Sequence, residues 1–270
     1  EKVNEKTLLN TGKIYLDIEL FNDAIKVFRK LTNLNKNNIK AEIELITAKK
    51  QICYWNDYDS DLRKIKKFIE DSENDNKNTY MYFEDNSEIH HKIAKSYSIK
   101  TFNNVTEDYY YIRENFDNRK IRIGYISSDF RDHPVTKLIS RIIELHDSSI
   151  FDVRAYSLFN EIEDEYTQYI KNSVNKFINL SDKGDDEIIS IIRKEKLDIA
   201  IDLMGFSRNA KPIIYAKRIA PIQINYLGYP GTMGSNFMDY IIADKILIPD
   251  EDKKFFSEKV MYLDKSPSCF

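Results

Sequence analysis

The chain has 270 residues, of which 42% are hydrophobic and 13% aromatic, enough for two compact units with cores of their own. The 41 Lys and Arg nearly balance the 44 Asp and Glu, and a net charge of -3 gives no positive surface for nucleic acid. The four His and two Cys show no metal-ligand spacing, and no apolar run reaches the roughly 18 residues of a membrane span, so composition predicts a cytoplasmic protein without a metal site or membrane anchor.

The first 34 residues carry apolar and small side chains at helical spacing, which predicts a helical hairpin over 5–34. Four of them stand at the relative positions that a tetratricopeptide repeat (TPR) gives to Gly, Tyr, Ala and an aromatic residue: Gly12, Tyr15, Ala24 and Phe28. Lys36 replaces the usual later Pro, so an ordinary antiparallel helix pair is the alternative. One repeat cannot bury its own face, and we expect further repeats before Glu1.

The helical pattern continues in three further stretches, at 39–52, 58–71 and 86–98. The residues that follow are polar and rich in Tyr, without a clear period. The sequence therefore predicts a helical region over residues 1–99 and a linker over 100–119.

A different pattern begins after Lys120. Short runs rich in β-branched residues predict strands at 121–126, 151–158, 177–180, 197–203 and 222–226, and helical stretches separate them at 135–147, 163–174 and 184–195. This alternation predicts a Rossmann-like, doubly wound parallel α/β domain over residues 120–270. Ligands of such sheets gather beyond the carboxyl ends of the strands, so the loops of interest are 127–137, 204–212 and 227–236.

The first of these loops contains His133, which follows the first strand and precedes a helix whose start is favoured by Pro134. An imidazole can move a proton near neutral pH, although a His at a loop-to-helix junction is more often structural. Asp129 could cap the following segment or orient the imidazole, and both roles stay open.

The other two loops are rich in Gly. Gly205 follows the buried-looking strand and leaves room for a ligand or a neighbouring backbone. Residues 227–234 place three Gly and one Pro directly after a strand, a composition that presents N–H groups to an anion or forms a purely structural turn.

Four stretches, in the same order along the chain, resemble the O-GlcNAc-transferase and SPINDLY family (glycosyltransferase family 41). Residues 51–58 resemble its Cys-Asp-Trp-x-Asp-Tyr segment, and 121–134 its first catalytic strand and His-Pro turn. Residues 220–232 (Ala-Pro-Ile-Gln through Leu-Gly-Tyr-Pro-Gly-Thr) resemble its most recognisable signature, which Met238–Asp244 continues. The resemblance runs from about Leu8 to the end of the chain.

The resemblance implies the amino-terminal half of a GT-B enzyme that moves N-acetylglucosamine from UDP-GlcNAc to Ser or Thr hydroxyls of proteins. The transfer inverts the configuration at the anomeric carbon of the sugar and uses no metal or other cofactor. The TPR-like helices present the protein acceptors. By this resemblance His133 is the active-site His, either a base or a group that lines the acceptor site. The substrate-binding residues implied beside it are Pro134, Thr136, Leu227, Gly228, Tyr229 and Pro230.

The chain departs from the family pattern in two respects. Lys176 stands where animal members carry His, which puts acceptor or donor handling in doubt. The half that holds the nucleotide is expected beyond Phe270, so the 270 residues are expected to be an inactive fragment, because charge on the leaving diphosphate needs fixed donors. Two alternatives stay open: a SPINDLY-like transferase that takes fucose from GDP-fucose, and a non-catalytic TPR adaptor.

Overall fold

A computed structural model describes residues 4–71, 85–105, 119–159 and 163–263. Its contacts divide the chain into two compact units, residues 1–85 and 86–270. No helix in the described ranges is both long and apolar enough to cross a membrane.

The first unit contains four helices: α1 (Glu5–Asp17), α2 (Phe21–Leu34), α3 (Ile39–Gln51) and α4 (Tyr58–Asp71). Asn4 caps α1 and Asn38 caps α3, each by accepting a backbone N–H with its side chain. Gly12 lies directly against Phe28, because a Cβ at Gly12 would stand 2.4 Å from the Phe28 ring. The predicted helical hairpin is confirmed, and its close helix approach depends on the Gly.

Lys49 links α3 to the turn that follows it. Its ammonium group is buried and lies 2.8 Å from Asp61 and 3.0 Å from Asp57. Burial lowers the pKa of the Lys49 ammonium, but the hydrogen bonds to the two carboxylates outweigh it and raise the pKa above its ordinary value. The charged trio fixes the start of α4.

The second unit begins with helix α5 (Ser87–Phe102), which Asn86 caps. The sequence pattern placed this helix with residues 1–99, but in the structure its contacts group it with the α/β unit. It also extends over residues 100–102 of the expected linker, of which 106–118 lie outside the described residues.

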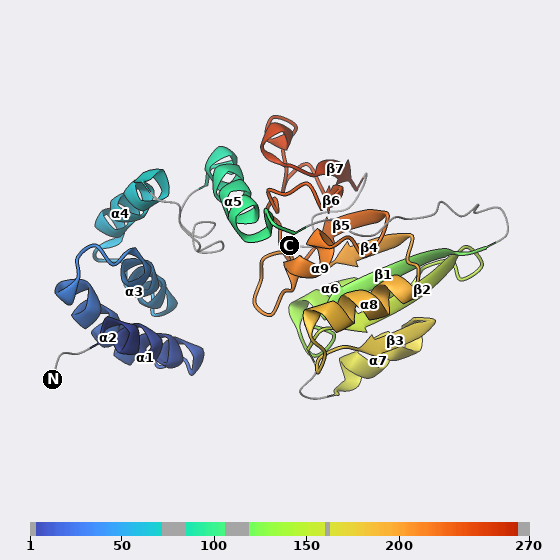
Figure 1. Ribbon diagram of the computed structural model, residues 1–270, viewed down its shortest axis with the longest axis horizontal. Coiled ribbons are helices and arrows are strands. Elements are labelled where there is room, and N and C mark those ends of the chain that lie inside the picture. The colour runs from blue at the N-terminus through green and yellow to red at the C-terminus, as the bar shows by residue number, and fades with distance from the viewer. Residues whose placement is uncertain (1–3, 72–84, 106–118, 160–162, 264–270) are drawn as a thin grey trace. The chain divides into compact units, whose positions relative to one another are not determined.

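The rest of this unit is a parallel sheet of seven strands (Figure 1). The strands are β1 (Ile121–Ser127), β2 (Phe151–Ser157), β3 (Lys176–Asn179), β4 (Ile199–Asp202), β5 (Ile222–Tyr226), β6 (Tyr240–Ala243) and β7 (Lys259–Tyr262). Their order is β3-β2-β1-β4-β5-β6-β7, and every neighbouring pair is parallel. The Rossmann-like prediction is confirmed, and β6 and β7 extend it by two strands that the pattern did not predict.

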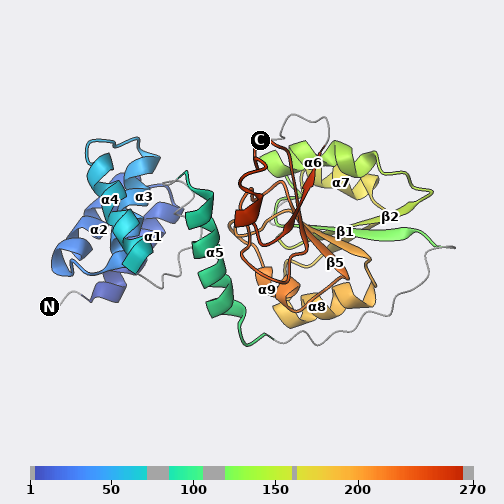
Figure 2. The ribbon, with the colours of Figure 1, turned by 90° about the horizontal axis from the view of Figure 1, so that it is seen from above.

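Helices cover both faces of the sheet, as parallel crossovers require. Figure 2 shows α6 (Pro134–Glu144) and α7 (Glu165–Ser173) on one face and α8 (Asp185–Lys194) and α9 (Pro212–Ala216) on the other. The core under α6 and α7 is formed by alternate strand residues and helix residues, among them Ile123, Tyr125, Val153, Ile201, Ile224, Ile139, Ile143 and Ile170.

Candidate functional site

The strand order reverses between β1 and β4, which are neighbours in the sheet although 71 residues separate their nearest ends (127 and 199). A crevice opens at such a reversal, and ligands of doubly wound sheets bind there. Three connections leave the sheet at or beside this point: loop one (128–133) after β1, loop two (203–211) after β4 and loop three (227–239) after β5. Every predicted site residue lies on loop one, loop three or the start of α6.

His133 is the N-cap residue of α6. Its Nδ1 accepts a hydrogen bond from the backbone N–H of Val135 at 3.3 Å, and about a third of its side chain is exposed. The Asp129 carboxylate lies 3.6 Å from the same Nδ1. When Nδ1 accepts from Val135, a neutral ring carries its proton on Nε2; when Nδ1 donates toward Asp129, Nε2 is free to accept a proton. Both states leave Nε2 as the nitrogen that can face a substrate.

Asp129 does not cap α6, because His133 does so. Its two carboxylate oxygens have different neighbours: Arg131 Nη2 lies 3.6 Å from Oδ1, and His133 Nδ1 lies 3.6 Å from Oδ2. Helix α7 anchors the loop around Asp129, since Thr167 donates its hydroxyl to the Phe130 carbonyl at 2.8 Å. Asp129 is thus a neighbour of the imidazole, while the hydrogen bond to Nδ1 comes from Val135; that Asp129 orients the ring stays a prediction.

Loop two begins with a tight turn built on Asp202. The carboxylate accepts from the N–H groups of Met204 at 2.9 Å and Gly205 at 3.1 Å, and it is buried. Burial raises the pKa of the Asp202 carboxyl to about 6, although the two N–H groups act in the opposite direction. Gly205 has φ +54°, a conformation that favours Gly, and a Cβ there would stand 2.4 Å from Tyr229.

Loop three has a strained start. Leu227 adopts φ +67°, and the Gly228 N–H donates back to the Tyr226 carbonyl at 2.8 Å. A Cβ on Gly228 would stand 1.8 Å from the Leu203 carbonyl oxygen, so only Gly fits here. The N–H groups of Gly228, Met233 and Gly234 all donate within the protein, and these three are therefore not aimed at an anion.

The predicted substrate-binding residues divide into buried and accessible ones. Thr136 is fully buried and donates its hydroxyl to the Asp129 carbonyl, while Leu227 and Tyr229 are 2% and 8% exposed. Pro134 is exposed, and Gly228 and Pro230 are half-buried. We expect the accessible residues to meet a ligand directly and the buried ones to shape the loops beneath it.

Side-chain and backbone contacts join the three loops. Met204 of loop two places its sulfur 3.4 Å from Ser127 Oγ and 3.2 Å from Ser128 N, at the start of loop one. Ser128 in turn donates its hydroxyl to the Asn209 carbonyl at 2.9 Å. Loops two and three meet where Gly205 packs against Tyr229. The structure thus brings the three predicted loops together at one edge of the sheet.

Two further residues shape loop three, and sequence reasoning did not identify them. Glu258, just before β7, is buried and accepts from Thr232 Oγ1 and Met233 N, both at 2.6 Å. Ser98 of α5 donates to the Met233 carbonyl, also at 2.6 Å. No local signal marks either residue, because each lies on an element far from the loop in sequence.

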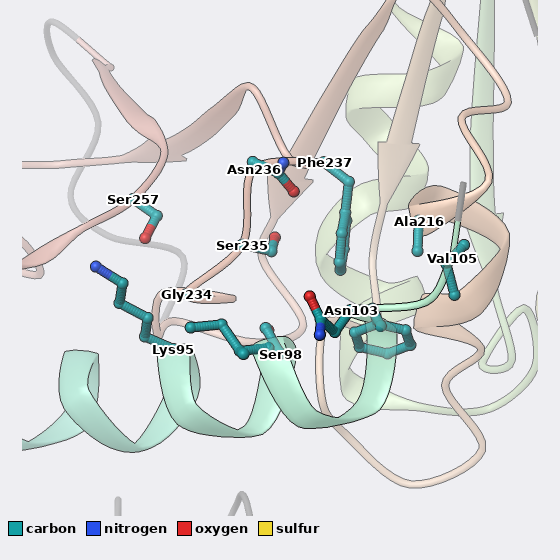
Figure 3. A pocket seen from close by; sticks show the side chains of 12 residues that line it. Lys95, Ser98, Asn103, Val105, Ala216, Gly234, Ser235, Asn236, Phe237 and Ser257 are labelled. Atoms are coloured by element: carbon teal, nitrogen blue, oxygen red, sulfur yellow. The ribbon is translucent and has the colours of Figure 1, made fainter. Parts of the chain in front are cut away.

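Helix α5 and loop three enclose a cavity of about 510 Å³ (Figure 3). Its lining combines one cation, several hydroxyl and amide groups and two Phe rings: Lys95, Ser98, Asn103, Ser235, Asn236, Ser257, Phe102 and Phe237. Gly234 lies at φ +58° against the backbone of α5, which sets how closely the loop approaches the helix. Residues 234–237 of loop three line this cavity, whereas none of the predicted site residues does.

Lys176, the departure from the family pattern, lies elsewhere. It is the first residue of β3, at the amino end of that strand, and its ammonium contacts Glu195 at 2.6 Å. The three loops leave the carboxyl ends of their strands. Lys176 therefore does not belong to the cluster around His133.

Comparison with known proteins gives a consistent result. Residues 52–268 match the model of glycosyl transferase family 41. A UDP-N-acetylglucosamine--peptide N-acetylglucosaminyltransferase from Caenorhabditis elegans is 31% identical over 227 residues, which cover 78% of this chain and 20% of the relative. A probable enzyme of the same name, SEC from Arabidopsis thaliana, is 34% identical over 152 residues, covering 56% of this chain and 15% of the relative. SPINDLY from Arabidopsis thaliana, described as a probable enzyme of that kind, is 32% identical over 155 residues.

The fold has a counterpart among solved structures. A mutant of the Thermobaculum terrenum O-GlcNAc transferase superimposes with a TM-score of 0.77 at 21% identity, over 98% of this chain and 52% of that chain. The 270 residues thus span a fifth or less of the length of these curated relatives and about half of the similar structure. The seven-stranded parallel sheet, the loops gathered at its order reversal and the match over residues 52–268 show that the chain belongs to glycosyl transferase family 41.

Proposed function

We propose that this chain contributes one half of the catalytic region of a protein Ser/Thr O-glycosyltransferase that transfers N-acetylglucosamine from UDP-GlcNAc with inversion and without a metal ion. The observation that carries the proposal is that loop two joins the His133 loop to the Leu227–Gly228 turn beside the order reversal of the sheet: Met204 contacts Ser128, and Leu203 lies against Gly228. The names of the curated relatives supply the donor and the peptide acceptor.

In the proposed reaction, a Ser or Thr hydroxyl oxygen attacks the anomeric carbon while the bond to the diphosphate oxygen breaks. The bonding electrons leave with the diphosphate, and the hydroxyl proton passes to a base, which is His133 Nε2 or, where His133 only lines the acceptor site, water. The role proposed for His133 is to meet the acceptor with Nε2. About a third of the His133 side chain is exposed, and the backbone N–H of Val135 donates to Nδ1, which leaves Nε2 for the acceptor.

The donor nucleotide requires positive or N–H groups that fix a diphosphate. Since three N–H groups of loop three donate within the protein, we propose that the diphosphate is held mainly by groups outside the described part of the chain. Isolated residues 1–270 are then expected to transfer sugar slowly or not at all.

The helical hairpin of α1 and α2 supports a proposal about the acceptor. Gly12, Ala24 and Phe28 occupy the contact between the two helices, as the TPR pattern predicts. We propose that this hairpin is TPR-like and helps to present protein substrates in the cytoplasm.

The test is transfer from radiolabelled UDP-GlcNAc to lysate proteins by the full-length protein, with His133→Ala and His133→Asn as variants. Asn is among the best N-cap residues, so His133→Asn keeps the cap of α6 and removes only the imidazole. Ser140→Ala, on the same helix and half-buried, is the control.

We expect wild type and the Ser140 variant to transfer sugar, also in the presence of a chelator, and both His133 variants to lose transfer. Full activity of His133→Asn would show that His133 serves only as the N-cap of α6. Transfer from GDP-fucose but not from UDP-GlcNAc would show that the donor is GDP-fucose. Transfer from neither donor would favour the non-catalytic TPR adaptor.

A further inference from the structure

Two buried polar side chains lie next to each other where β4 and β5 end. Asp202 and Asn225 are register partners in these neighbouring parallel strands, so their side chains point to the same face of the sheet. Asp202 is 1% exposed and Asn225 is 0% exposed. Burying such groups is unfavourable unless they are hydrogen-bonded, so their partners are informative.

Asp202 acts on loop two only as an acceptor. Its two oxygens take the N–H groups of Met204 and Gly205, which turns the chain back directly after β4. That turn places the Met204 sulfur against Ser127 and Ser128 of the His133 strand and loop. Asp202 therefore sets loop two and, through Met204, the start of loop one.

Asn225 acts on loop three only as a donor. Its Nδ2 lies 3.2 Å from the Tyr229 carbonyl and 3.2 Å from the Gly231 carbonyl. Two carbonyl oxygens can be met only by the NH₂ end of the amide, so these partners fix its orientation. Both carbonyls belong to the turn that contains Gly228 and Pro230.

We propose that Asp202 and Asn225 form a pair of positioning residues for the glycosyl-transfer site, in which one side chain fixes loop two and the other fixes loop three. The proposal rests on the proposed function for its catalytic consequence, but not for its structural one. It requires opposite hydrogen-bonding characters at the two positions: an acceptor at 202 and a donor at 225.

The isosteric change Asn225→Asp tests this requirement without a change of volume. It places carboxylate oxygens opposite the two carbonyls of loop three, which removes both hydrogen bonds and adds repulsion. A loop displaced by about 1 Å costs an enzyme on the order of 100-fold in rate.

The chain offers a matched control in Gln223→Glu. Gln223 lies two residues earlier on the same face of β5, is 0% exposed, and also donates its amide to two carbonyls, those of Tyr215 and Phe237. The two changes therefore create the same chemical conflict at the same depth. The Tyr215 carbonyl lies in α9 and the Phe237 carbonyl at the far end of loop three, so neither belongs to the turn at 227–231.

The experiment measures kcat and KM of the full-length protein with UDP-GlcNAc and a protein acceptor, together with hydrogen exchange of peptides that cover residues 203–211 and 227–233. We expect Asn225→Asp to lower kcat/KM about 100-fold per folded molecule and Gln223→Glu to stay within about threefold of wild type. Asn225→Asp should speed exchange in 227–233 and Asp202→Asn in 203–211, while Gln223→Glu leaves both segments protected.

Equal activity losses in Asn225→Asp and Gln223→Glu would overturn the proposal, because a general loss of stability would then explain both. If either variant does not fold, Asn225→Ala and Gln223→Ala replace them, since these changes remove the donors without adding a charge. If wild type transfers no sugar, the proposed function fails, but hydrogen exchange still tests whether Asp202 and Asn225 position the loops. Unchanged exchange in 227–233 of Asn225→Asp would refute that positioning role.

Discussion

Replacing Asp202 by Asn should make the protein's stability less dependent on pH. Asp202 lies under loop two, and burial raises its pKa from 3.8 to about 6. A carboxyl whose pKa is higher in the folded state favours folding fully below 3.8, and this contribution is lost as pH rises through about 6. An Asn side chain does not ionise, so the variant avoids this loss.

The size of the effect follows from the two pKa values. Moving the pKa from 3.8 to about 6 costs the ionised folded state about 3 kcal/mol, at 1.36 kcal/mol for each pKa unit. Of this, about 2 kcal/mol falls above about pH 4.5, where the measurement is practical. The unfolding free energy of Asp202→Asn, relative to wild type, should therefore rise by about 2 kcal/mol between about pH 4.5 and about pH 8.

The assay is urea unfolding of both proteins at each pH, followed by circular dichroism. The difference between the two proteins cancels the titration of all other groups. Asp198→Asn is the control of opposite sign: burial raises the pKa of Asp198, but the hydrogen bonds from Arg119 and Arg122 outweigh it and hold the pKa below its ordinary value. Its contribution is present at neutral pH and is lost in acid. A flat difference for Asp202→Asn, or one that falls as pH rises, would refute the reasoning.

Three further substitutions have defined outcomes. Gly228→Ala puts a Cβ 1.8 Å from the Leu203 carbonyl oxygen, so we expect loop three to shift and transfer by the full-length protein to fall at least tenfold, on the order of 1.4 kcal/mol in barrier; unchanged kinetics would contradict this contact. Phe28→Ala empties a fully buried position and should cost about 3–5 kcal/mol, read from the urea dependence of Trp55 fluorescence in the same unit, and a loss under about 1 kcal/mol would disprove the close helix contact. Glu258→Gln removes a carboxyl whose pKa burial raises, so its stability relative to wild type should increase with pH in the same urea assay, and a decrease would show that the carboxylate is stabilised by loop three.

The parts of the fold that follow from sequence are those with a local period. Strand β5 was predicted with the bounds that the structure has, and the Gly12 and Phe28 contact follows from the spacing of small and aromatic residues. Buried strands and helix pairs repeat their apolar residues at fixed intervals, which a single sequence displays.

Strands β6 and β7 were not predicted. In β7 only alternate positions are partly buried, whereas all four positions of β6 are buried or partly buried. Helix α5 was predicted as a helix, but its partner was not. An apolar stripe shows that Ala94 and Tyr97 are buried and does not show what covers them.

The same limit applies to the candidate site. The three loops could be located from the strand order, because ligand-binding loops follow the carboxyl ends of parallel strands. Asn225 looked like an ordinary strand residue, and Glu258 gave no signal. Their importance depends on carbonyl and N–H groups of loop three, whose positions arise only when distant strands pair.

Among the described residues the all-parallel sheet ends at β3 on one side and β7 on the other, and edge strands can pair with another chain and lead to aggregation. Both edge strands, β3 and β7, have four residues, and each begins with a Lys. Short edges and lysines on them are the means by which soluble sheets avoid joining edge to edge. Lys176 does not belong to the cluster around His133; it stands instead on the β3 edge, where a charged side chain disfavours pairing with a second copy.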